Sequence, residues 1–330
     1  MKALVFREFG GPEVLHISEV ADPAVSAGSV VVRTKAIGLN FADVYRRKGN
    51  YHLAGEAPWI LGYEGAGIVE QVGEGVVGIR VGDRIGFADA PHANAELVKV
   101  DADRVIPLPP DISFELAASV LLQGLTAHYL VHDSYPVRAG DDVVVHAAAG
   151  GVGQLLVQLC KLKGARVVGL TSNEDKRQVA IQAGADEVFL YGDSTCTGHM
   201  IAWSQAVRDW SSGGTGANVV YDSVGSTLMD SFASVKEKGT VVFYGMAGGE
   251  PPRIDPRMLM DSSLTLTGGD LWNHVTTREE RVRRSGELFG DIMTGKLCVE
   301  ASTIFPLSEG TAAHRLLESR QSTGKIILTP

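Results

Sequence analysis

An apolar run that passes directly into alanines and glycines is the feature that most constrains the fold of this chain. Residues 143–146 read VVVH and residues 147–153 read AAAGGVG. Ala148, Gly150 and Gly153 fill the three small-residue positions of a dinucleotide-binding fingerprint, with alanine in place of the first glycine. Such a turn lets the backbone approach a pyrophosphate and points a helix N-terminus at that anion. The stretch predicts a nucleotide site, the alternative being a plain tight turn between a strand and a helix.

The sequence on either side of the turn agrees with a nucleotide site. Residues 142–147 are apolar and β-branched, which is typical of a short buried strand. After the glycines, apolar residues recur at helical spacing until Gly164, where a helix should end. Residues 166–170 supply a second strand. The turn is therefore predicted to lie within a βαβ unit.

Length and composition limit the classes of protein that are possible. The chain has 330 residues, of which 45% are hydrophobic, so two domains with proper cores are expected. The formal net charge of −9 disfavours nucleic acid or an anionic membrane surface as a partner. No apolar run is expected to reach the ~20 residues that span a bilayer. Three cysteines without a CxxC pair are typical of reduced thiols, so a cytoplasmic protein is expected.

Short β segments dominate residues 1–110. The expected strands lie at residues 2–6, 14–17, 29–37, 65–73, 83–87 and 96–100. Many short strands at this spacing predict a compact antiparallel barrel. Ser113 should then cap a helix with its apolar face at residues 116–122, and residues 123–127 should separate it from a second helix over 127–134.

From residue 142 onward, strands alternate with helices. Six strands are expected, at residues 142–147, 166–170, 187–191, 217–221, 240–244 and 264–267. This is the number expected for a doubly wound parallel sheet. The tail should form helices at 278–293 and 307–319 and strands at 299–305 and 325–328. Because this last portion needs a partner sheet, we infer that the nucleotide domain is inserted into a discontinuous first domain.

Several motifs, in a fixed order, resemble one enzyme superfamily over nearly the whole chain. They are IGLNFAD at residues 37–43, LGYEGAG at 61–67, VGDR at 81–84, GLTA at 124–127, HAAAGGVG at 146–153 and VYDSVG at 220–225. The chain resembles the medium-chain dehydrogenases/reductases, and within them the zinc-free, NADPH-dependent quinone oxidoreductases related to zeta-crystallin. The resemblance implies an α/β protein with a GroES-like β-rich catalytic domain over 1–123 and 268–330, and a Rossmann domain with a doubly wound parallel sheet over 124–267. It also implies a substrate cleft between the domains and a homodimer.

The metal ligands of the zinc-dependent members of this superfamily are not matched. Asn40 stands near the place where the resemblance would expect a cysteine, and Tyr63 where it would expect a histidine. No cysteine occurs in residues 87–96, the region of a structural zinc loop in those relatives. His128 and His132 are four residues apart, yet a third ligand is not evident. No metal is therefore expected.

The nucleotide site is expected to prefer NADPH to NADH. An NAD site usually has an Asp or Glu at the tip of the second strand, about 20 residues beyond the glycines. Here residues 170–173 read LTSN, and the acids at 174 and 175 come later, where they would favour a helix N-terminus. By resemblance, the residues around a 2′-phosphate would be Ser172, Lys176, Tyr191 and Arg320. Without the resemblance, the lysine and the arginine would be interpreted as solvated surface charges.

Hydride transfer requires the nicotinamide to meet its acceptor in a water-poor cleft. The further cofactor-binding candidates are Gly151 and Val152 in the turn, Thr126 for the carboxamide, and Tyr244 and Gly245 for the nicotinamide end. Asn40 would position ribose or substrate. Tyr45 and Tyr51, on the loop after Asn40, would donate to the oxygen of a reduced quinone or enolate, or would be half-buried aromatic residues without a catalytic role.

The resemblance therefore predicts an NADPH:quinone oxidoreductase that reduces a quinone or a related conjugated carbonyl without a metal. A conjugated acceptor activates itself, so strong general acid catalysis is not required. The nearest alternative is a zinc-free alkenal or enoyl double-bond reductase on the same fold. An alternative of another class is a non-catalytic NADPH-binding protein with a structural or sensing role.

Overall fold

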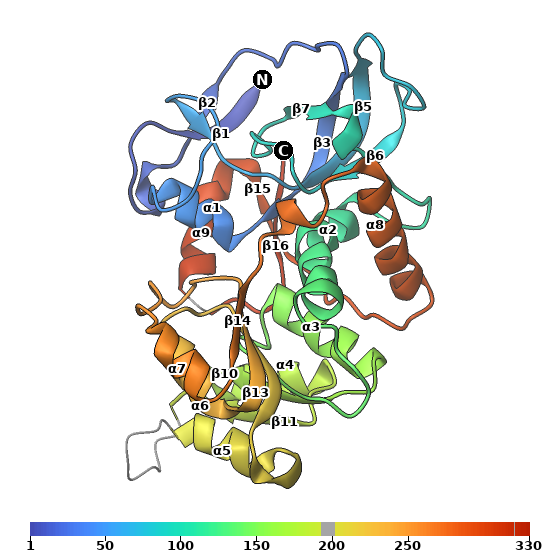
Figure 1. The fold of residues 1–330 in the computed structure, drawn as a ribbon. Coiled ribbons are helices and arrows are strands. Elements are labelled where there is room, and N and C mark those ends of the chain that lie inside the picture. The colour runs from blue at the N-terminus through green and yellow to red at the C-terminus, as the bar shows by residue number, and fades with distance from the viewer. Residues whose placement is uncertain (193–201, 320) are drawn as a thin grey trace. The chain divides into compact units, whose positions relative to one another are not determined.

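The computed structural model describes residues 1–192, 202–319 and 321–330. Its contacts divide the chain into two compact units. Unit 1 comprises Met1–Leu125, Val275–Thr294 and Val299–Pro330, and unit 2 comprises Thr126–His274 and Gly295–Cys298. Each unit has its own hydrophobic core. Figure 1 shows the ribbon of both units, coloured along the chain.

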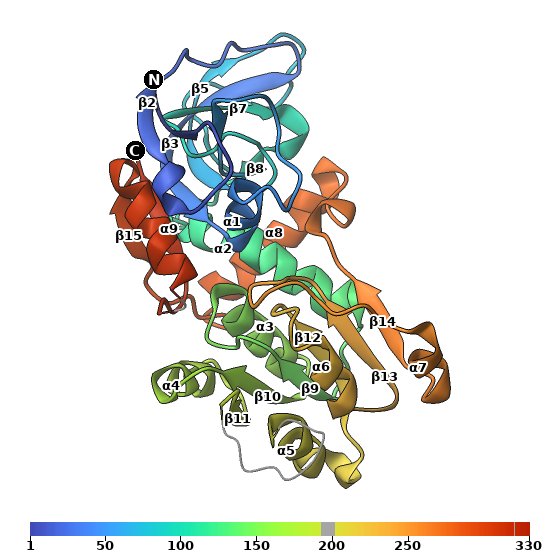
Figure 2. The ribbon, with the colours of Figure 1, turned by 90° about the vertical axis from the view of Figure 1, so that its left-hand side faces the viewer.

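A six-stranded parallel sheet forms the centre of unit 2 (Figure 2). Its strands are β9 (Asp142–Val145), β10 (Arg166–Thr171), β11 (Glu187–Leu190), β12 (Ala217–Asp222), β13 (Val235–Phe243) and β14 (Thr265–Gly268). They lie in the order β11-β10-β9-β12-β13-β14, which is that of a doubly wound dinucleotide-binding sheet. The six strands predicted from the sequence are confirmed, with shifted ends.

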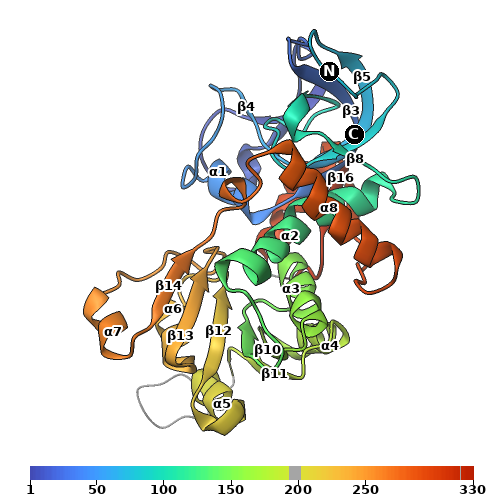
Figure 3. The same ribbon diagram turned by 45° about the vertical axis from the view of Figure 1, so that its right-hand side comes forward.

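Helices cover both faces of this sheet. The pair α3 (Gly151–Leu162) and α4 (Glu174–Gln182) lies on one face, and the pair α5 (Ala202–Trp210) and α6 (Leu228–Ser234) lies on the other (Figure 3). A short helix, α7 (Pro256–Asp261), precedes β14. Val144, Val168 and Val220 of the central strands are fully buried. Nearly continuous apolar strands are what a parallel sheet covered on both faces requires.

Unit 1 is built mainly from antiparallel strands. A three-stranded sheet contains β1 (Lys2–Phe6), β2 (His16–Glu19) and β4 (Trp59–Ile60). A larger sheet contains β3 (Ser29–Leu39), β5 (Gly65–Val72), β6 (Arg84–Phe87), β7 (Leu97–Asp101), β8 (Ile106–Pro107), β15 (Thr303–Pro306) and β16 (Ile326–Thr329). β16 pairs with β3, and β15 pairs in parallel with β16. The tail of the chain therefore completes the N-terminal sheet.

The helices that begin in unit 1 are α1 (Phe41–Arg47), α2 (Phe114–Tyr129), α8 (Arg278–Met293) and α9 (Gly310–Glu318), counted over the described part of the chain. Short 3-10 helices lie at Pro12–Val14, Ala102–Arg104 and Leu307–Glu309 in unit 1, and at Ser212–Gly214 and Leu271–Asn273 in unit 2. α8 begins and ends where the sequence predicts. The loop expected directly after Asn40 is wrong, because those residues form α1.

The predicted interruption at residues 123–127 is also wrong, because α2 continues through Gly124. A Cβ on Gly124 would lie 3.1 Å from Cδ1 of Leu288 in α8. This glycine therefore allows two helices to approach closely and does not end the first one. A π-helical turn, Leu130–Ser134, extends α2 further. The strand expected at 14–17 is shifted by two residues, to β2, and the strand expected at 299–305 is shortened, to β15.

The combined segment Phe114–Ser134 corrects the expectation that no apolar run approaches the length of a membrane span. The segment has 21 residues, and its most apolar 18-residue window has a mean hydropathy of 1.2, so it is long and apolar enough by length and composition alone. In the structure, 67% of its most apolar window is buried inside the protein. A mostly buried core helix passes the same test, so this segment is weak evidence for a span.

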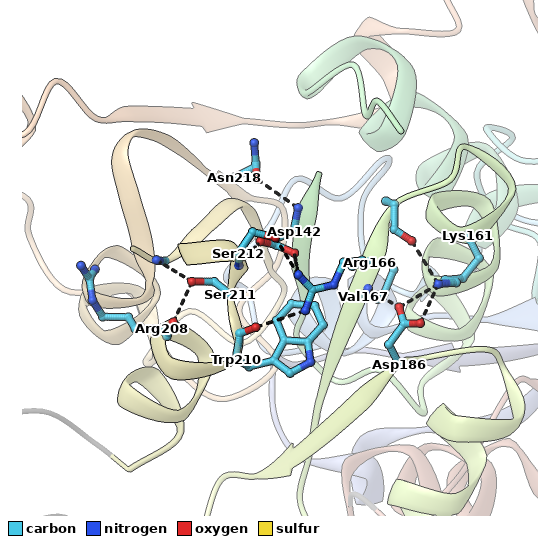
Figure 4. A network of polar contacts seen from close by, with 12 residues as sticks. Asp142, Lys161, Arg166, Val167, Asp186, Arg208, Trp210, Ser211, Ser212 and Asn218 are labelled. Carbon is cyan, nitrogen blue, oxygen red and sulfur yellow. Dashed lines mark hydrogen bonds and ion pairs between the residues drawn. The ribbon is translucent and has the colours of Figure 1, made fainter. Parts of the chain in front are cut away.

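Polar side chains join the amino ends of the unit 2 strands (Figure 4). Arg166, which begins β10, pairs with Asp142 of β9 at 3.1 Å and lies 4.2 Å over the Trp210 ring. Asp186, just before β11, pairs with Lys161 Nζ at 2.7 Å. Ligands of doubly wound sheets bind at the opposite, carboxyl edge. We therefore assign these contacts to the stability of the sheet.

Candidate functional site

The fingerprint turn lies at the carboxyl edge of the unit 2 sheet, between β9 and α3. Gly150 is the N-cap of α3, and its amide donates to the Ala147 carbonyl at 2.8 Å. Gly151 and Val152 begin the helix and are half-buried. Ala147 has a φ of 48°, a left-handed conformation that is costly for a residue with a side chain. The turn therefore leaves the first amides of α3 at the edge where a nucleotide phosphate binds.

Lack of space explains why the turn needs small residues. A Cβ on Gly153 would lie 2.3 Å from the Ala147 carbonyl oxygen and 2.8 Å from Ala148 Cα. A Cβ on Gly150 would lie 3.2 Å from the same oxygen. Ala148 faces Gly169 of β10, where a Cβ would come within 2.9 Å of the alanine methyl. Alanine fits in the first fingerprint position because the neighbouring strand has a glycine opposite it.

Ser172, Lys176 and Tyr191 lie on segments that meet at the ends of β10 and β11. Ser172 follows β10 and is exposed, and Lys176 lies in the first turn of α4. The Tyr191 amide donates to the carbonyl of the last β10 residue at 2.9 Å, which holds the two strand ends together. Asn173 caps α4 by accepting from the Lys176 amide at 2.9 Å. The tip of β10 is thus followed by a hydroxyl and an amide side chain, where an NAD site has a carboxylate.

Three further candidates in unit 2 were assigned to the nicotinamide end. Thr126 lies on α2 and is 9% exposed. Tyr244 and Gly245 follow β13, and the Tyr244 amide donates to the carbonyl at the end of β12 at 3.0 Å. A Cβ on Gly245 would lie 3.0 Å from the Ser223 carbonyl oxygen, so this turn has little room for a side chain. Arg320, expected at the 2′-phosphate, lies outside the described residues.

A buried polar group beneath the fingerprint turn was not predicted from the sequence. His146, Ser231 and Asp222 are fully buried, and hydrogen bonds join them to the Tyr191 hydroxyl. His146 and Asp222 stand in two of the motifs that carry the family resemblance. Ser231 stands in none of them, so no sequence signal connects these residues.

In unit 1, Asn40 precedes α1, and its side-chain amide is held on both sides. Its Nδ2 donates to Glu64 Oε2 at 2.9 Å, and its Oδ1 accepts from Lys325 Nζ at 2.8 Å. Lys325 Nζ and Glu64 Oε2 are 2.6 Å apart, with Glu64 fully buried and Lys325 only 3% exposed. A Cβ on Gly38 would lie 2.2 Å from Glu64 Oε2, so this glycine makes room for the pair. A buried ion pair therefore fixes the orientation of the Asn40 amide.

Tyr51 lies near a second buried cation, Arg46, and Tyr45 packs its ring against Phe41. Tyr45 is on α1 itself, not on the expected loop, and Tyr51 follows the helix. Arg46 is fully buried, and its guanidinium lies 5.0 Å from the Tyr51 ring centroid and 3.7 Å from that of Tyr63. Its Nη1 lies 3.4 Å from Asp43, whose pKa is raised by burial although the guanidinium opposes this. Arg46 therefore holds the Tyr51 and Tyr63 rings in position.

The side chains at the positions expected for zinc ligands do not form a metal centre. Among the residues that the structure describes, no group of three or more His, Cys, Asp or Glu side chains could hold a metal ion. His128 and His132 stack with ring centroids 4.1 Å apart, and His132 Nδ1 lies 2.8 Å from the His128 carbonyl oxygen. At Asn40 the neighbouring cation is the Lys325 ammonium, which would repel a metal ion placed beside it.

The chain matches two family models, the alcohol dehydrogenase GroES-like domain over residues 26–135 and the zinc-binding dehydrogenase over residues 151–283. A quinone oxidoreductase of Pseudomonas aeruginosa is 37% identical, with 100% of this chain and 99% of the relative covered. A 2-haloacrylate reductase of a Burkholderia species is 35% identical, with 99% and 98% covered. The solved structure of Escherichia coli quinone oxidoreductase complexed with NADPH is 36% identical, with a TM-score of 0.94 and both chains fully covered. The chain therefore belongs to the quinone oxidoreductase family of the medium-chain dehydrogenases/reductases.

Proposed function

We propose that this protein is an NADPH-dependent oxidoreductase that transfers hydride to a quinone or a related conjugated carbonyl. Full-length similarity to quinone oxidoreductases carries this proposal, because one relative is 37% identical over essentially the whole of both chains. The fit of the turn supports it, since a Cβ on Gly153 would lie 2.3 Å from the Ala147 carbonyl oxygen and only a bare backbone can form this cradle. Bound NADPH supplies the hydride.

The residues of the two units divide the work of binding and positioning. The proposed phosphate-binding residues are Ala148, Gly150, Gly151, Val152 and Gly153 for the pyrophosphate, and Ser172, Lys176, Tyr191 and Arg320 for the 2′-phosphate. Thr126, Tyr244 and Gly245 orient the nicotinamide end. Asn40 is a positioning residue, because Glu64 and Lys325 hold its amide in place. Tyr45 and Tyr51 donate hydrogen bonds to the oxygen that becomes negative when hydride adds to the acceptor.

The reaction that we propose uses no metal. Conjugation delocalises the charge that hydride addition creates, so hydrogen-bond donors are sufficient to stabilise it, and a proton completes the reduction at oxygen. The surroundings of Asn40 and Tyr63, which stand where zinc-dependent relatives have metal ligands, support a reaction without a metal. The Asn40 amide accepts from the Lys325 ammonium, and the Tyr63 ring lies against the Arg46 guanidinium.

The 2′-phosphate assignment predicts the effect of one lysine. Lys176→Ala should raise the Kd for NADPH about ten-fold or more and change the Kd for NADH less than about two-fold, because only NADPH loses a charge-assisted partner. Fluorescence titration with each cofactor measures both constants. Lys161→Ala is the matched control, because Lys161 pairs with Asp186 near the amino edge of the same sheet and should affect neither cofactor. Equal losses for NADPH and NADH in Lys176→Ala would refute the assignment.

The proposed reaction is tested by incubating the purified protein with NADPH and a panel of quinones and enones. We expect oxidation of NADPH by at least one quinone, with less than one equivalent of zinc by elemental analysis after dialysis. A full equivalent of retained zinc would overturn the metal-free proposal. Tight NADPH binding without oxidation by any acceptor would instead support the non-catalytic alternative.

A zinc-free double-bond reductase is the second candidate function. The Burkholderia relative favours it, since a 2-haloacrylate reductase is 35% identical over nearly the full length of both chains. The same panel separates the two candidates by kcat/KM. A preference for an enone or 2-haloacrylate over every quinone would select the double-bond reductase.

We also propose a cytoplasmic homodimer with no nucleic-acid or membrane partner. The sparse cysteines and the net charge of −9 support the compartment and the absence of anionic partners. The edge of the unit 2 sheet supports the dimer, because β14 is exposed along most of its length and includes Leu266, which is 36% exposed. Light scattering coupled to size-exclusion chromatography measures the oligomeric state.

A further inference from the structure

Beneath the fingerprint turn, four side chains form an unbroken line of hydrogen bonds. The Tyr191 hydroxyl accepts from the Ala147 amide at 3.0 Å and lies 3.0 Å from His146 Nδ1. His146 Nε2 lies 3.0 Å from Ser231 Oγ, and Ser231 Oγ donates to Asp222 Oδ2 at 2.7 Å. The histidine, the serine and the aspartate are fully buried. The line therefore runs from the backbone of the turn to a carboxylate inside unit 2.

The carboxylate determines the direction of every proton in this line. Asp222 accepts from the amides of Val224 and Gly225 at 2.8 and 3.0 Å and from Thr227 Oγ1 at 2.9 Å, as well as from Ser231. Burial alone would raise the pKa of Asp222, but the neighbouring His146 ring, 4.0 Å away, and the hydrogen bonds from Gly225, Ser231 and Val224 hold it below its ordinary value. An ionised carboxylate can only accept, so the single Ser231 proton points to it.

The donor and acceptor of each remaining hydrogen bond follow from the orientation of the Ser231 proton. Since Ser231 uses its proton on Asp222, its oxygen accepts from His146, which must carry its proton on Nε2. His146 Nδ1 is then an acceptor, so the Tyr191 hydroxyl donates to it, and the tyrosine oxygen is left to accept from Ala147. Burial also lowers the pKa of His146, which agrees with a neutral ring. Every donor in the line has an acceptor, and none can be reversed alone.

The line connects three strand ends at the edge where the cofactor binds. His146 follows β9, Tyr191 follows β11 and Asp222 ends β12, while Ser231 lies on α6. The Trp203 and His146 rings pack in a T-shaped arrangement, with centroids 5.2 Å apart at 88°. Ala147, the residue that receives this support, has the left-handed φ of 48°. Displacing either the tyrosine or the turn would therefore break hydrogen bonds to a network whose other members, His146, Ser231 and Asp222, are fully buried.

We propose that His146, Ser231 and Asp222 are positioning residues that hold Tyr191 and the Ala147 turn in the geometry that binds NADPH. They act on the cofactor through these two groups and do not touch the reacting atoms. They should therefore set the affinity for NADPH and leave the rate of the chemical step nearly unchanged. The inference rests on NADPH binding alone, so it stands or falls independently of which acceptor is reduced.

Ser231→Ala is the most conservative change that interrupts the line. It should raise the Kd and KM for NADPH about ten-fold and change kcat less than about two-fold, because only binding geometry is lost. Ser234→Ala is the matched control. Ser234 is equally buried on α6, but its hydroxyl donates to the Ser231 carbonyl at 2.9 Å and is not part of the line. We expect Ser231→Thr, which keeps the hydroxyl, to restore most of the affinity.

Nitrogen-15 NMR of histidine tests the line without any substrate. The His146 signals, identified by their loss in His146→Gln, should show the Nε2–H tautomer with a pKa below the ordinary value for histidine. Ser231→Ala should change the tautomer or shift this pKa, and Ser234→Ala should do neither. An Nδ1–H tautomer in the unmodified protein would overturn the proposal. So would equal NADPH affinities in the Ser231→Ala and Ser234→Ala variants, which would leave the line with a structural role only.

Discussion

Lys325→Met should lower the free energy of unfolding of unit 1 by about 3–5 kcal/mol, because it leaves the Glu64 carboxylate buried without its cation. The ammonium and the carboxylate are 2.6 Å apart, and the two side chains are 3% and 0% exposed. Water cannot replace the lost partner at such a site. Hydrogen exchange of the β3 and β16 amides reports on unit 1 separately from unit 2, and denaturant unfolding gives the overall change.

Two further variants test whether the loss of stability in Lys325→Met comes from burial of the ion pair. Glu64→Gln in the Lys325→Met background removes the remaining charge and should recover a large part of the loss, which a double-mutant cycle measures. Arg33→Met breaks an ion pair between β3 and β5 of the same sheet, where Arg33 and Glu70 are 46% and 40% exposed. That variant should lose no more than about 1 kcal/mol, since solvent screens exposed pairs. Similar losses in Lys325→Met and Arg33→Met would contradict the burial described for Lys325.

The same change reaches the candidate active site through Asn40. Without the ammonium, Asn40 Oδ1 loses the donor that lies 2.8 Å away, while Nδ2 keeps its bond to Glu64. The amide is then held only through Nδ2, and Asn40 should position substrate or ribose less well. Loss of activity should therefore accompany loss of stability.

The parts of the fold that follow from local chemistry could be predicted from the sequence. The central strands β9, β10 and β12 of unit 2 are buried along nearly their whole length, so their positions are visible in the sequence as short hydrophobic runs. The glycines of the turn are dictated by contacts within a few residues, as the space around Gly153 shows. Absence of an acid at the tip of β10 is equally a local feature.

Features that depend on distant residues could not be predicted in this way. Gly124 has the appearance of a helix break, but its role depends on Leu288 of α8, far along the chain. Lys325 begins a segment at the end of the chain, and nothing near it indicates that its ammonium meets Asn40 and Glu64. The line from Tyr191 to Asp222 likewise joins segments that only the doubly wound topology brings together. Motifs in the sequence therefore identified candidate site residues, but they did not identify the distant residues that hold those candidates in position.

Gly153→Ala should weaken NADPH binding at least about ten-fold and destabilise unit 2 by about 1–3 kcal/mol, the usual cost of overpacking a filled site. The new methyl carbon would lie 2.3 Å from the Ala147 carbonyl oxygen and 2.8 Å from Ala148 Cα. Both neighbours are backbone atoms of the turn, so the strain can be relieved only by moving α3 away from the turn or by moving the turn itself. Either movement displaces the amides that face the pyrophosphate.

The effects of alanine substitutions at three glycines on the affinity for NADPH should follow an order set by the space around each glycine. At Gly150 a methyl would lie 3.2 Å from the same oxygen, so a shift of a few tenths of an ångström accommodates it and the loss of affinity should be smaller. At Gly286, inside α8, a methyl meets no atom within 4 Å. Gly286→Ala should therefore leave NADPH binding unchanged and stabilise the helix by about 0.5–1 kcal/mol. Isothermal titration and thermal unfolding of the three variants give the order, and an affinity in Gly153→Ala equal to that in Gly286→Ala would show that the backbone of the turn does not approach the cofactor.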